Sequence, residues 1–568
     1  MSYADKTQMI KARLVSSLEK CFPDGRPEYF RPVESVHVFK NQRISLQIAI
    51  RADRGDPFRR WVRPECRGLP AECVSFREVG CVPSDLPAYP GKSDEGYLRT
   101  EPGLFPDILE PLQMEGLVRA VAGSLRAVWI DIDMNAFDWS GITGPSDLPV
   151  SFSIFSDEPE IVMPLTLKLI PAELPDTGFR VTQWFHSDCL ASYYNVDVFS
   201  ERHWEIIENF MRTFVRCGNN TILTPVFTPP LDTHIGGERP TVQLVKVKKG
   251  GNGRYYFDFA LLDRWIDTAD RCGVKYFEIS HLFTQWGAKH APKIMAETPE
   301  GYRRIFGWET DATGKDYPRF LRAFIQALLS HLKARGDDRR CLFHISDEPN
   351  REQLDQYLAS KATVADLLDG YTVIDALSNV DFYLSGAVQT PVPSNNHIEP
   401  FIKAFADEGR EGLWTYYCCG QSIGVSNRLM AMTGARTRFI GTQFWKYRIA
   451  GFLQWGFNFY YNCGSYDLIN PYINSTGSGW VPSGDTYSVY PASDGRALES
   501  VRINHFREGL DDMRALALLE SLIGRERTLE AVESVAGEIV FSRCVCGTAQ
   551  MLALRDRIDS LIAENLTK

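Results

Sequence analysis

Eight short apolar segments alternate with helical segments between residues 179 and 461, and this alternation restricts the fold more than any other feature of the chain. Such alternation is typical of parallel βα units. No G-x-G-x-x-G or Walker-type loop follows any of the predicted strands, so a closed (β/α)8 barrel is favoured over an open doubly wound sheet. The predicted strands are FRVTQWFHSD (179–188), NTILTPVFT (220–228), VKYFEISHLF (274–283), CLFHISDEP (341–349), YTVIDALS (371–378), DFYLSGAV (381–388), GLWTYYCC (412–419) and GFLQWGFNFYY (451–461).

Helical segments fall between most of these strands, and several end in glycine, as a helix C-cap often does. They cover residues 200–218, 258–273, 317–336, 351–368, 396–409 and 427–448. A polar stretch rich in Gly, Ser and Pro follows the last strand and leads to helices that begin near Leu498 and near residue 548. We expect these last helices to pack on the barrel exterior.

The first third of the chain has a different pattern, with short β-branched or alternating runs that turn residues separate. Regularly spaced short strands of this kind predict a β-sandwich. The segments GLFPDILEPL (103–112) and PAYPGKSDEGY (87–97) are rich in Pro and Gly, so we interpret both as connections. The predicted strands are ESVHVFK (34–40), ISLQIAIRA (44–52), CVSFREVG (73–80), RAVWIDIDM (126–134), PVSFSIFS (149–156) and IVMPLTLKLI (161–170).

The length of 568 residues is too great for one hydrophobic core, and the turn-rich segment PAELPDTG (171–178) is the natural boundary. We therefore expect an N-terminal β-sandwich over residues 1–175, the barrel over 176–525 and a C-terminal helical extension over 526–568. The sandwich would either shape the site or form the interface of a homodimer. The sequence leaves both roles open.

Charge and hydropathy exclude several classes of function. The formal net charge is −10, whereas a nucleic-acid footprint or an anionic membrane surface would favour a basic excess. The start of the chain lacks the apolar core of a signal peptide, and no uninterrupted apolar run of about 18 residues occurs. We expect a cytoplasmic protein that binds neither nucleic acid nor membrane. The 13 cysteines have no regular spacing, so most are predicted to be reduced core thiols.

Polar residues at the ends of the predicted strands are the candidates for chemistry, because a barrel carries its active site at the carboxyl ends of its strands. Two carboxylates, Asp347 and Glu348, end the fourth strand in the run HISDEPN. Pro349 forces the chain out of that strand at once. The other strand-end candidates are Asp188, Asp232, Glu238, His281, Gln285, Tyr416, Tyr417 and Asn458.

The pair Asp347 and Glu348 gives the sharpest prediction. Burial and mutual repulsion should keep one of the two carboxyl groups protonated near neutral pH, which provides one acid and one anion. An alternative is structural, since Asp before Pro is a normal N-cap for the helix that follows. Aromatic residues make up 12% of the chain and cluster near the strand ends. Because aromatic rings pack on the C–H face of a pyranose, we predict that Trp184, Trp286 and Trp455 bind a sugar.

Adjacency of the two carboxylates restricts the mechanism of a glycosidase. An ordinary retaining enzyme holds its nucleophile and acid roughly 5–5.5 Å apart, usually on different strands, which neighbours on one strand cannot easily do. A substrate that supplies its own nucleophile, the 2-acetamido oxygen of an N-acetylhexosamine, removes this requirement. One carboxylate then orients the acetamide, and its neighbour protonates the leaving oxygen.

Two other chemistries use the same region. A metal site is conceivable from His186, Asp188 and His281, but the spacing H-E-x-x-H and the spacing C-x-x-C are both missing from the sequence. Cys418 is conceivable as a nucleophile, but no nearby residue supplies the third, orienting group. We predict neither a metal nor an organic cofactor.

Several motifs resemble those of the family-123 glycoside hydrolases and their wider relatives. They include TQWFHSDCLASYY, SERHWEIIENF, ILTPVFTPPLDT, FEISHLFTQWGAKHAPKI, HISDEPN, GFLQWGFNFYYN, GDTYSVYP and ESVRINHFREGLDD, and the similarity covers about residues 179–520. The resemblance implies a retaining β-N-acetylgalactosaminidase with a sandwich and a barrel. It implies that Asp347 polarises the 2-acetamido group and that Glu348 is the general acid/base. Trp184, Asp188, His281, Trp286, Tyr416, Trp455 and Asn458 are our predictions for the carbohydrate-binding residues. Alternatives are a glycosidase for another sugar, such as a β-N-acetylglucosaminide or a sugar without an acetamide, and a carbohydrate-binding protein without turnover.

Overall fold

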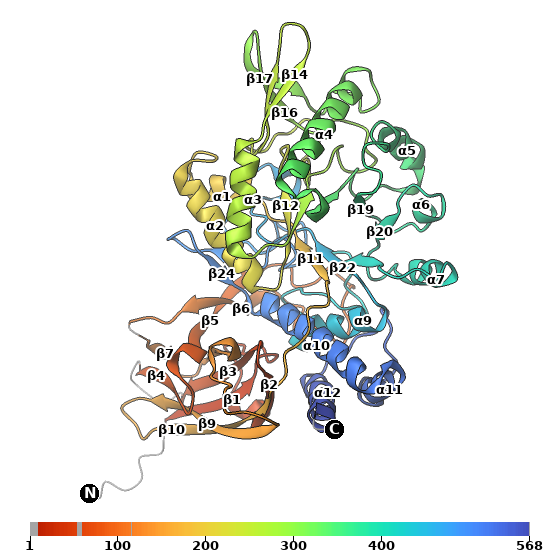
Figure 1. Cartoon of the computed structure of the whole chain (residues 1–568). Coiled ribbons are helices and arrows are strands. Elements are labelled where there is room, and N and C mark those ends of the chain that lie inside the picture. Colours follow the sequence, from red (N-terminus) through yellow and green to blue (C-terminus); the bar gives the residue numbers. More distant parts are fainter. Residues whose placement is uncertain (1–8, 54–59, 115, 567–568) are drawn as a thin grey trace, which may run out of the picture.

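The computed structural model describes residues 9–53, 60–114 and 116–566. Two five-stranded sheets make up the N-terminal region, which is red to orange in Figure 1. Only the pair β2–β10 is parallel among their strand pairs. The first sheet has the order β1 (Ile10–Ser16), β3 (Arg43–Ala52), β8 (Leu125–Asp133), β5 (Val74–Ser84), β6 (Gly103–Pro111). The second has the order β2 (Ser35–Phe39), β10 (Ile161–Ile170), β9 (Ser146–Phe155), β4 (Arg60–Arg67), β7 (Val118–Ala120).

Alternating residues of both sheets meet in one hydrophobic core. In β3, every second residue from Ile44 to Ile50 enters this core, and in β10 every second residue from Leu165 to Leu169 does so. A strand repeats its side-chain direction every two residues, so these alternations place one face of each sheet against the other. The six strands predicted for this region are present, and the structure adds β1, β4, β6 and β7.

The prediction that GLFPDILEPL is a connection was wrong, because these residues form the edge strand β6. Edge strands and bulges tolerate proline, which cannot donate to a ladder. The register against β5 skips Asp107 beside Pro106, at a bulge. A bulge re-aims a side chain, and the buried Asp107 carboxylate accepts hydrogen bonds of 2.7 and 2.9 Å from Arg502 in the barrel region.

An eight-stranded parallel sheet follows residues 171–179, which carry no regular secondary structure. A bridge between Ser394 and Tyr416 joins its two outer strands, so the sheet forms a nearly closed barrel. The strands in chain order are β11 (Arg180–Gln183), β12 (Thr221–Thr224), β15 (Tyr276–Ile279), β18 (Cys341–Phe343), β19 (Thr372–Ala376), β20 (Thr390–Val392), β21 (Trp414–Tyr416) and β22 (Gly451–Gln454).

Seven of the eight predicted strands contain these elements, and the sixth does not. DFYLSGAV contains the short helix α6 (Asp381–Leu384), and the sixth strand is β20. The backbone N–H of Asp381 donates to the Asn379 side chain at the start of the helix, a local bond that competes with strand formation. Strand β20 was missed because Pro391 lies inside it, where proline argues against a strand.

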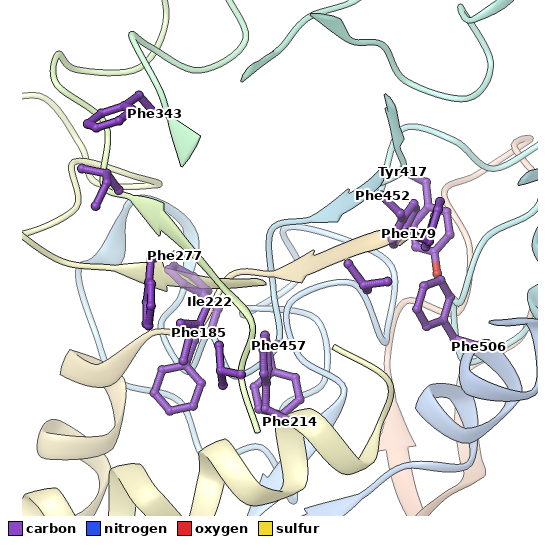
Figure 2. Close-up of a cluster of buried hydrophobic side chains, with 14 of the residues drawn as sticks. Phe179, Phe185, Phe214, Ile222, Phe277, Phe343, Tyr417, Phe452, Phe457 and Phe506 are labelled. Atoms are coloured by element: carbon purple, nitrogen blue, oxygen red, sulfur yellow. The ribbon is translucent and has the colours of Figure 1, made fainter. Parts of the chain in front are cut away.

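Both faces of the barrel strands are covered, and neighbouring residues enter different cores. Ile222 and Phe452 join the large core between strands and helices that Figure 2 shows, whereas Leu223 and Leu453 point into the barrel interior. Helices supply the other side of this large core. In α2 (Glu201–Arg216), for example, Ile207, Phe210 and Phe214 are buried at helical spacing. This arrangement leaves the strand ends as the place for a site.

The remaining helices surround the barrel and extend to the C-terminus (Figure 1). They are α1 (Ser187–Tyr194), α3 (Ala260–Cys272), α4 (Asp316–Arg335), α5 (Leu354–Ala362), α7 (Glu399–Asp407), α8 (Gly434–Arg438), α9 (Ile440–Lys446), α10 (Val501–Ile523), α11 (Arg525–Ala536) and α12 (Thr548–Leu566). A four-stranded sheet projects at the top of the view, in the order β14 (Tyr255–Asp258), β13 (Lys246–Lys249), β16 (Ile294–Thr298), β17 (Gly301–Phe306). A short pair joins β23 (Val489–Pro491) to β24 (Ala497–Glu499). Among the described helices, none has the length and apolarity needed to cross a membrane.

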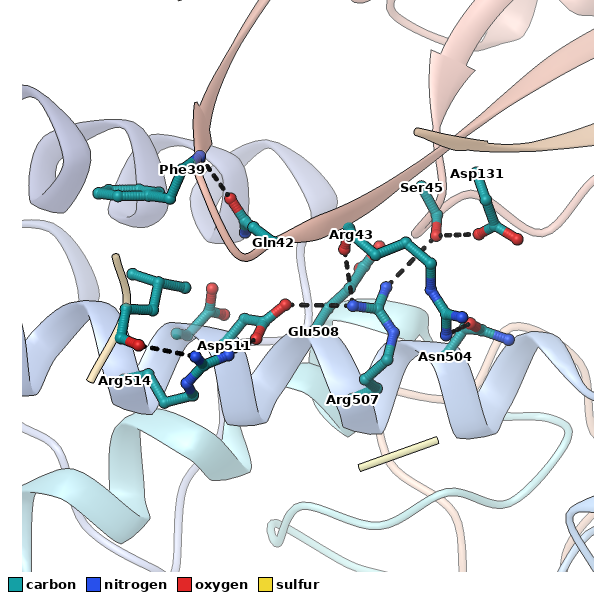
Figure 3. Close-up of polar contacts among 12 residues, drawn as sticks. Phe39, Gln42, Arg43, Ser45, Asp131, Asn504, Arg507, Glu508, Asp511 and Arg514 are labelled. Carbon is teal, nitrogen blue, oxygen red and sulfur yellow. Dashed lines mark hydrogen bonds and ion pairs between the residues drawn. The ribbon is translucent and has the colours of Figure 1, made fainter. Parts of the chain in front are cut away.

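Helix α10 connects the barrel to the N-terminal sheets through a buried polar network (Figure 3). Arg507 donates hydrogen bonds to the backbone oxygen of Arg43 (2.6 Å) and to Asp511 (3.1 Å). Ser45 of β3 donates to Asp131 of β8 at 2.8 Å. Burial of so many charges is tolerated only when they are paired, so this network fixes the orientation of the two regions.

Candidate active site

Asp347 and Glu348 lie in the loop that follows β18, at the carboxyl end of the barrel. Asp347 is buried, whereas Glu348 is exposed. Glu348 has a φ of 43°, a left-handed conformation that a non-glycine residue rarely adopts. It breaks the strand alternation that would direct adjacent side chains to opposite faces, so both carboxylates can serve one site.

Hydrogen bonds from neighbouring strand ends hold this loop. The hydroxyl of Tyr416, the last residue of β21, donates to Oε1 of Glu348 at 2.7 Å. The backbone N–H of Trp286 donates to the backbone oxygen of Asp347 at 2.8 Å, and that of Glu348 donates to Ala376 at 3.0 Å. The site is therefore built from the ends of β15, β18, β19 and β21.

The N-cap alternative for Asp347 is not what the structure shows. The short 3-10 helix Arg351–Gln353 is capped by Asn350, whose side chain and that of Gln353 form a capping box. Asp347 precedes this cap by three positions. Its carboxylate is therefore left for another task.

Four carboxyl groups at this end of the barrel, those of Asp347, Glu348, Asp232 and Asp485, interact electrostatically. Burial, then the charges of Glu348 and Asp232, raise the pKa of Asp347 well above its usual value. Burial raises the pKa of Asp232 to about 7, with contributions from Glu348 and Asp485. Burial also raises the pKa of Asp485 to about 6. Such clusters of shifted carboxyl groups are characteristic of acid–base sites.

A buried network lies in the barrel interior beneath these carboxylates. Glu278 accepts hydrogen bonds from Nε1 of Trp184 (2.7 Å) and from Nε2 of His344 (2.6 Å). His344 Nδ1 lies 3.4 Å from Asp375. Burial opposes a charge on His344, but the hydrogen bonds and charges of Asp375 and Glu278 outweigh it and raise its pKa to about 9. These contacts favour the protonated form of His344, which interacts electrostatically with Asp347.

His281 completes this interior layer. Its ring stacks on that of His344 with centroids 4.2 Å apart, and it meets the edge of Trp184 at 5.2 Å. Both ring nitrogens of His281 are buried and lack a hydrogen-bond partner among the described residues. Burial and the charge of His344 lower the pKa of His281 well below its usual value. A neutral imidazole keeps one donor and one acceptor.

Trp455 follows β22 and lies beside Asp485. Its Nε1 donates to Asp485 at 2.9 Å, and its ring packs against Trp480 with centroids 5.5 Å apart. Trp455 and Trp480 are half-exposed. Trp286, with a φ of 60°, is 46% exposed.

Three of the predicted carbohydrate-binding residues are buried and bonded within the protein: Trp184, which donates to Glu278, and also Asp188 and Asn458. Asp188 forms a buried two-pronged ion pair with Arg239, at 2.7 and 2.8 Å. The Asn458 side chain accepts a hydrogen bond from the backbone N–H of His186 and donates one to the backbone oxygen of the same residue. These contacts explain Asp188 and Asn458 as supports of the segments behind the site.

The alternative chemistries find little support here. The described residues contain no group of three or more His, Cys, Asp or Glu side chains arranged for a metal ion. A hydrogen bond with Cys419, together with burial, raises the pKa of the Cys418 thiol well above its usual value. A thiol held in this form is a weak nucleophile.

The predicted set omitted four polar residues that the structure brings into the site. Glu278, His344 and Asp375 each interrupt an apolar strand, in FEIS, FHIS and VIDA, and a polar residue inside such a run is the signal that could have identified them. Asp485 lies 31 positions after Gln454 in a long loop, and no local pattern places it beside Trp455.

Residues 184–519, more than half of the chain, match the family "Glycoside hydrolase 123, catalytic domain". The chain is also similar in structure to a family 123 glycoside hydrolase from Clostridium perfringens, studied for the details of glycolipid glycan hydrolysis. The TM-score is 0.73 with 14% sequence identity, and 99% of each chain is covered. An endo-β-1,4-mannanase from Thermotoga petrophila matches with a TM-score of 0.32 and 12% identity, over 59% of this chain and 77% of the other. No curated protein matches the sequence.

Proposed function

The chain belongs to glycoside hydrolase family 123, and from this premise we propose that it releases terminal β-linked N-acetylgalactosamine by a retaining, substrate-assisted mechanism. In this proposal Asp347 orients the 2-acetamido group, whose oxygen attacks the anomeric carbon. Glu348 protonates the leaving oxygen and later deprotonates the water that opens the oxazolinium ion. The observation that carries the proposal is the adjacency of a buried Asp347 and an exposed Glu348 that Tyr416 holds in place.

The proton of the pair must be on Glu348 when the reaction begins. In the free protein, burial and the neighbouring charges favour a proton on Asp347. An acetamide N–H that donates to Asp347 would stabilise its anion, because a hydrogen bond to the charged form lowers a pKa. Substrate binding thus creates the orienting anion, and a sugar without an acetamide would not.

Recognition is assigned to the predicted residues that stay accessible near the strand ends. His281 is fully buried, so in this proposal it supports the sugar site from beneath and does not contact a hydroxyl group. Trp455 presents a half-exposed ring, which suits the C–H face of a pyranose. The galactosamine configuration is part of the proposal, and it follows from the family resemblance.

The proposal is tested with p-nitrophenyl N-acetyl-β-galactosaminide and the variants Asp347→Asn and Glu348→Gln. Loss of a catalytic acid or an orienting group typically costs about 10²–10⁴-fold in rate, so we expect kcat to fall by at least 100-fold in each variant. Glu352→Gln and Asp355→Asn are matched controls, because both carboxylates are exposed on the next segment. Circular dichroism verifies folding. Near wild-type rates in both catalytic variants would refute the assignment.

Sugar specificity needs a separate measurement. A panel of nitrophenyl glycosides that includes the N-acetylglucosaminide and the non-acetylated galactoside separates the proposed activity from the alternatives. We expect the N-acetylgalactosaminide to have the highest kcat/KM, and the galactoside to be inert because it lacks the nucleophilic oxygen. Faster hydrolysis of the galactoside would contradict substrate assistance.

A further inference from the structure

A loop of the N-terminal sheets reaches into the barrel beside the active site. The inserted loop, defined here as residues 83–98 at and beyond the end of β5, packs against the segments that follow β21 and β22. Its backbone and side chains bond to both segments. The contacts are Ser475 to Pro83 (2.7 Å), Thr476 to Asp85 (2.8 Å), Ser483 to Leu86 (3.0 Å), Gly424 to Asp94 (2.6 Å), Arg436 to Asp94 (2.5 Å) and Leu98 to Ala431 (2.7 Å).

Tyr89 is the residue of the inserted loop that contacts the segments carrying Trp480 and Cys419. Its hydroxyl donates to the backbone oxygen of Trp480 at 3.2 Å, and its side chain is in hydrogen-bond contact with Cys419. Trp480 packs on Trp455, and Asp485 interacts with both Trp455 and Tyr89. Tyr89, Trp455 and Trp480 are all half-exposed, so three aromatic side chains from three segments border the same surface.

The position of this aromatic surface relative to the two carboxylates is defined by β21. Tyr416 donates to Glu348, and Cys419, which contacts Tyr89, follows Tyr416 by three residues. The exposed Trp286 instead bonds to the backbone of Asp347. Cys418 interacts electrostatically with both Glu348 and Tyr89, so Tyr89 lies on the Glu348 side of the site. A general acid must approach the leaving oxygen, so the leaving group extends toward that side.

We propose that Tyr89, supplied by the N-terminal sheets, is a specificity-determining residue that contacts the group released from the sugar. This inference rests on the proposed function, because it uses Glu348 as the acid. The ring of Tyr89 packs against a second sugar in the leaving position, and its hydroxyl offers a polar contact at the edge. The N-terminal sheets are then part of the enzyme's substrate-binding surface, beyond supporting the barrel.

The test distinguishes binding of the leaving group from binding of the sugar that is cleaved. We compare wild type, Tyr89→Ala and Tyr89→Phe with two probes. A disaccharide with terminal N-acetylgalactosamine β-linked to galactose fills both positions, whereas N-acetylgalactosamine thiazoline fills only the position of the cleaved sugar. Lys92→Ala is the matched control, since Lys92 is an exposed residue of the same loop.

For Tyr89→Ala, we expect kcat/KM on the disaccharide to fall by about tenfold or more, mostly through KM, with the thiazoline inhibition constant within about twofold of wild type. Tyr89→Phe keeps the ring and the fold, so it should retain most of the activity. Lys92→Ala should match wild type. Unchanged hydrolysis of the disaccharide by Tyr89→Ala, or equal losses with both probes, would overturn the inference. A wild-type protein that neither binds the thiazoline nor cleaves the disaccharide refutes the proposed function itself, a result that the wild type alone reveals.

Discussion

The hydroxyl of Tyr416 donates a hydrogen bond of 2.7 Å to the carboxylate of Glu348, across the barrel from the end of β21 to the loop after β18. Glu348 is exposed and adopts a left-handed backbone conformation, so its own loop gives its side chain little support. Tyr416, by contrast, is buried. A buried residue thus holds an exposed carboxylate in place, and the proposed acid needs such positioning.

Removal of that hydroxyl in Tyr416→Phe should lower kcat by about 10- to 100-fold, the effect of losing a hydrogen bond to a charged group. The value of KM should change little. Tyr417→Phe is the matched control, because the Tyr417 hydroxyl has no hydrogen-bond partner in the described part of the chain. Equal activity of the two variants would show that the contact to Glu348 does not matter.

Asp232 should destabilise the folded protein at high pH. Its pKa is raised from about 4 to about 7 by folding, so the folded state binds the proton more tightly, and stability falls as the pH rises through about 7. Asp232→Asn removes this cost. We expect the variant to be more stable than wild type by about 2 kcal/mol at pH 8 and similar to wild type at pH 4. The expected gain is smaller than the full pKa shift implies, because Asp232 is partly exposed and solvent screens its carboxylate. Urea denaturation at both values measures this. Equal stability at pH 8 would contradict the account of the carboxylate cluster.

His344 should have the opposite role, as a stabilising cation between Glu278 and Asp375. Its folded pKa of about 9 exceeds the ordinary value of 6.5, so its contribution is complete below about pH 6.5 and disappears as the pH rises through about 9. His344→Gln leaves two buried carboxylates without their cation and should cost about 3–5 kcal/mol at pH 6.

The half-exposed pair of His331 and Asp263, 2.7 Å apart, provides the control for that experiment. His331→Gln should cost less than about 1 kcal/mol, as exposed ion pairs do. Thermal melts at pH 6 and pH 9.5 compare the two variants. A loss in His344→Gln that is as small as in the control would mean that the imidazolium is not needed beneath the site.

The parts of the site that could be predicted from the sequence are those that neighbouring residues in the chain determine. The run HISDEPN places two carboxylates directly after an apolar strand, and proline ends that strand, so Asp347 and Glu348 could be identified without a structure. Tyr416 could be found in the same way. Strand β20 could not, because Pro391 argues against a strand and DFYLSGAV has the composition of one.

Contacts between distant segments explain what could not be predicted. Asp485 reaches Trp455 only because a long loop folds back over β22. Tyr89 reaches the barrel only because the N-terminal sheets dock on α10, through pairs such as Asp107 and Arg502. The bulge that aims Asp107 lies in a segment whose prolines indicated a connection. Such positions depend on tertiary packing, and local sequence patterns do not record it.

The acetamide oxygen of the substrate is the proposed nucleophile, and its role can be measured with a series of nitrophenyl N-acetyl-β-galactosaminides that carry zero to three fluorine atoms on the acetyl group. Fluorine withdraws electrons and weakens the amide oxygen as a nucleophile. We expect kcat/KM to decrease with every added fluorine, on the order of 100-fold or more over the series. A value of kcat/KM that does not depend on the number of fluorine atoms would contradict this role of the acetamide oxygen.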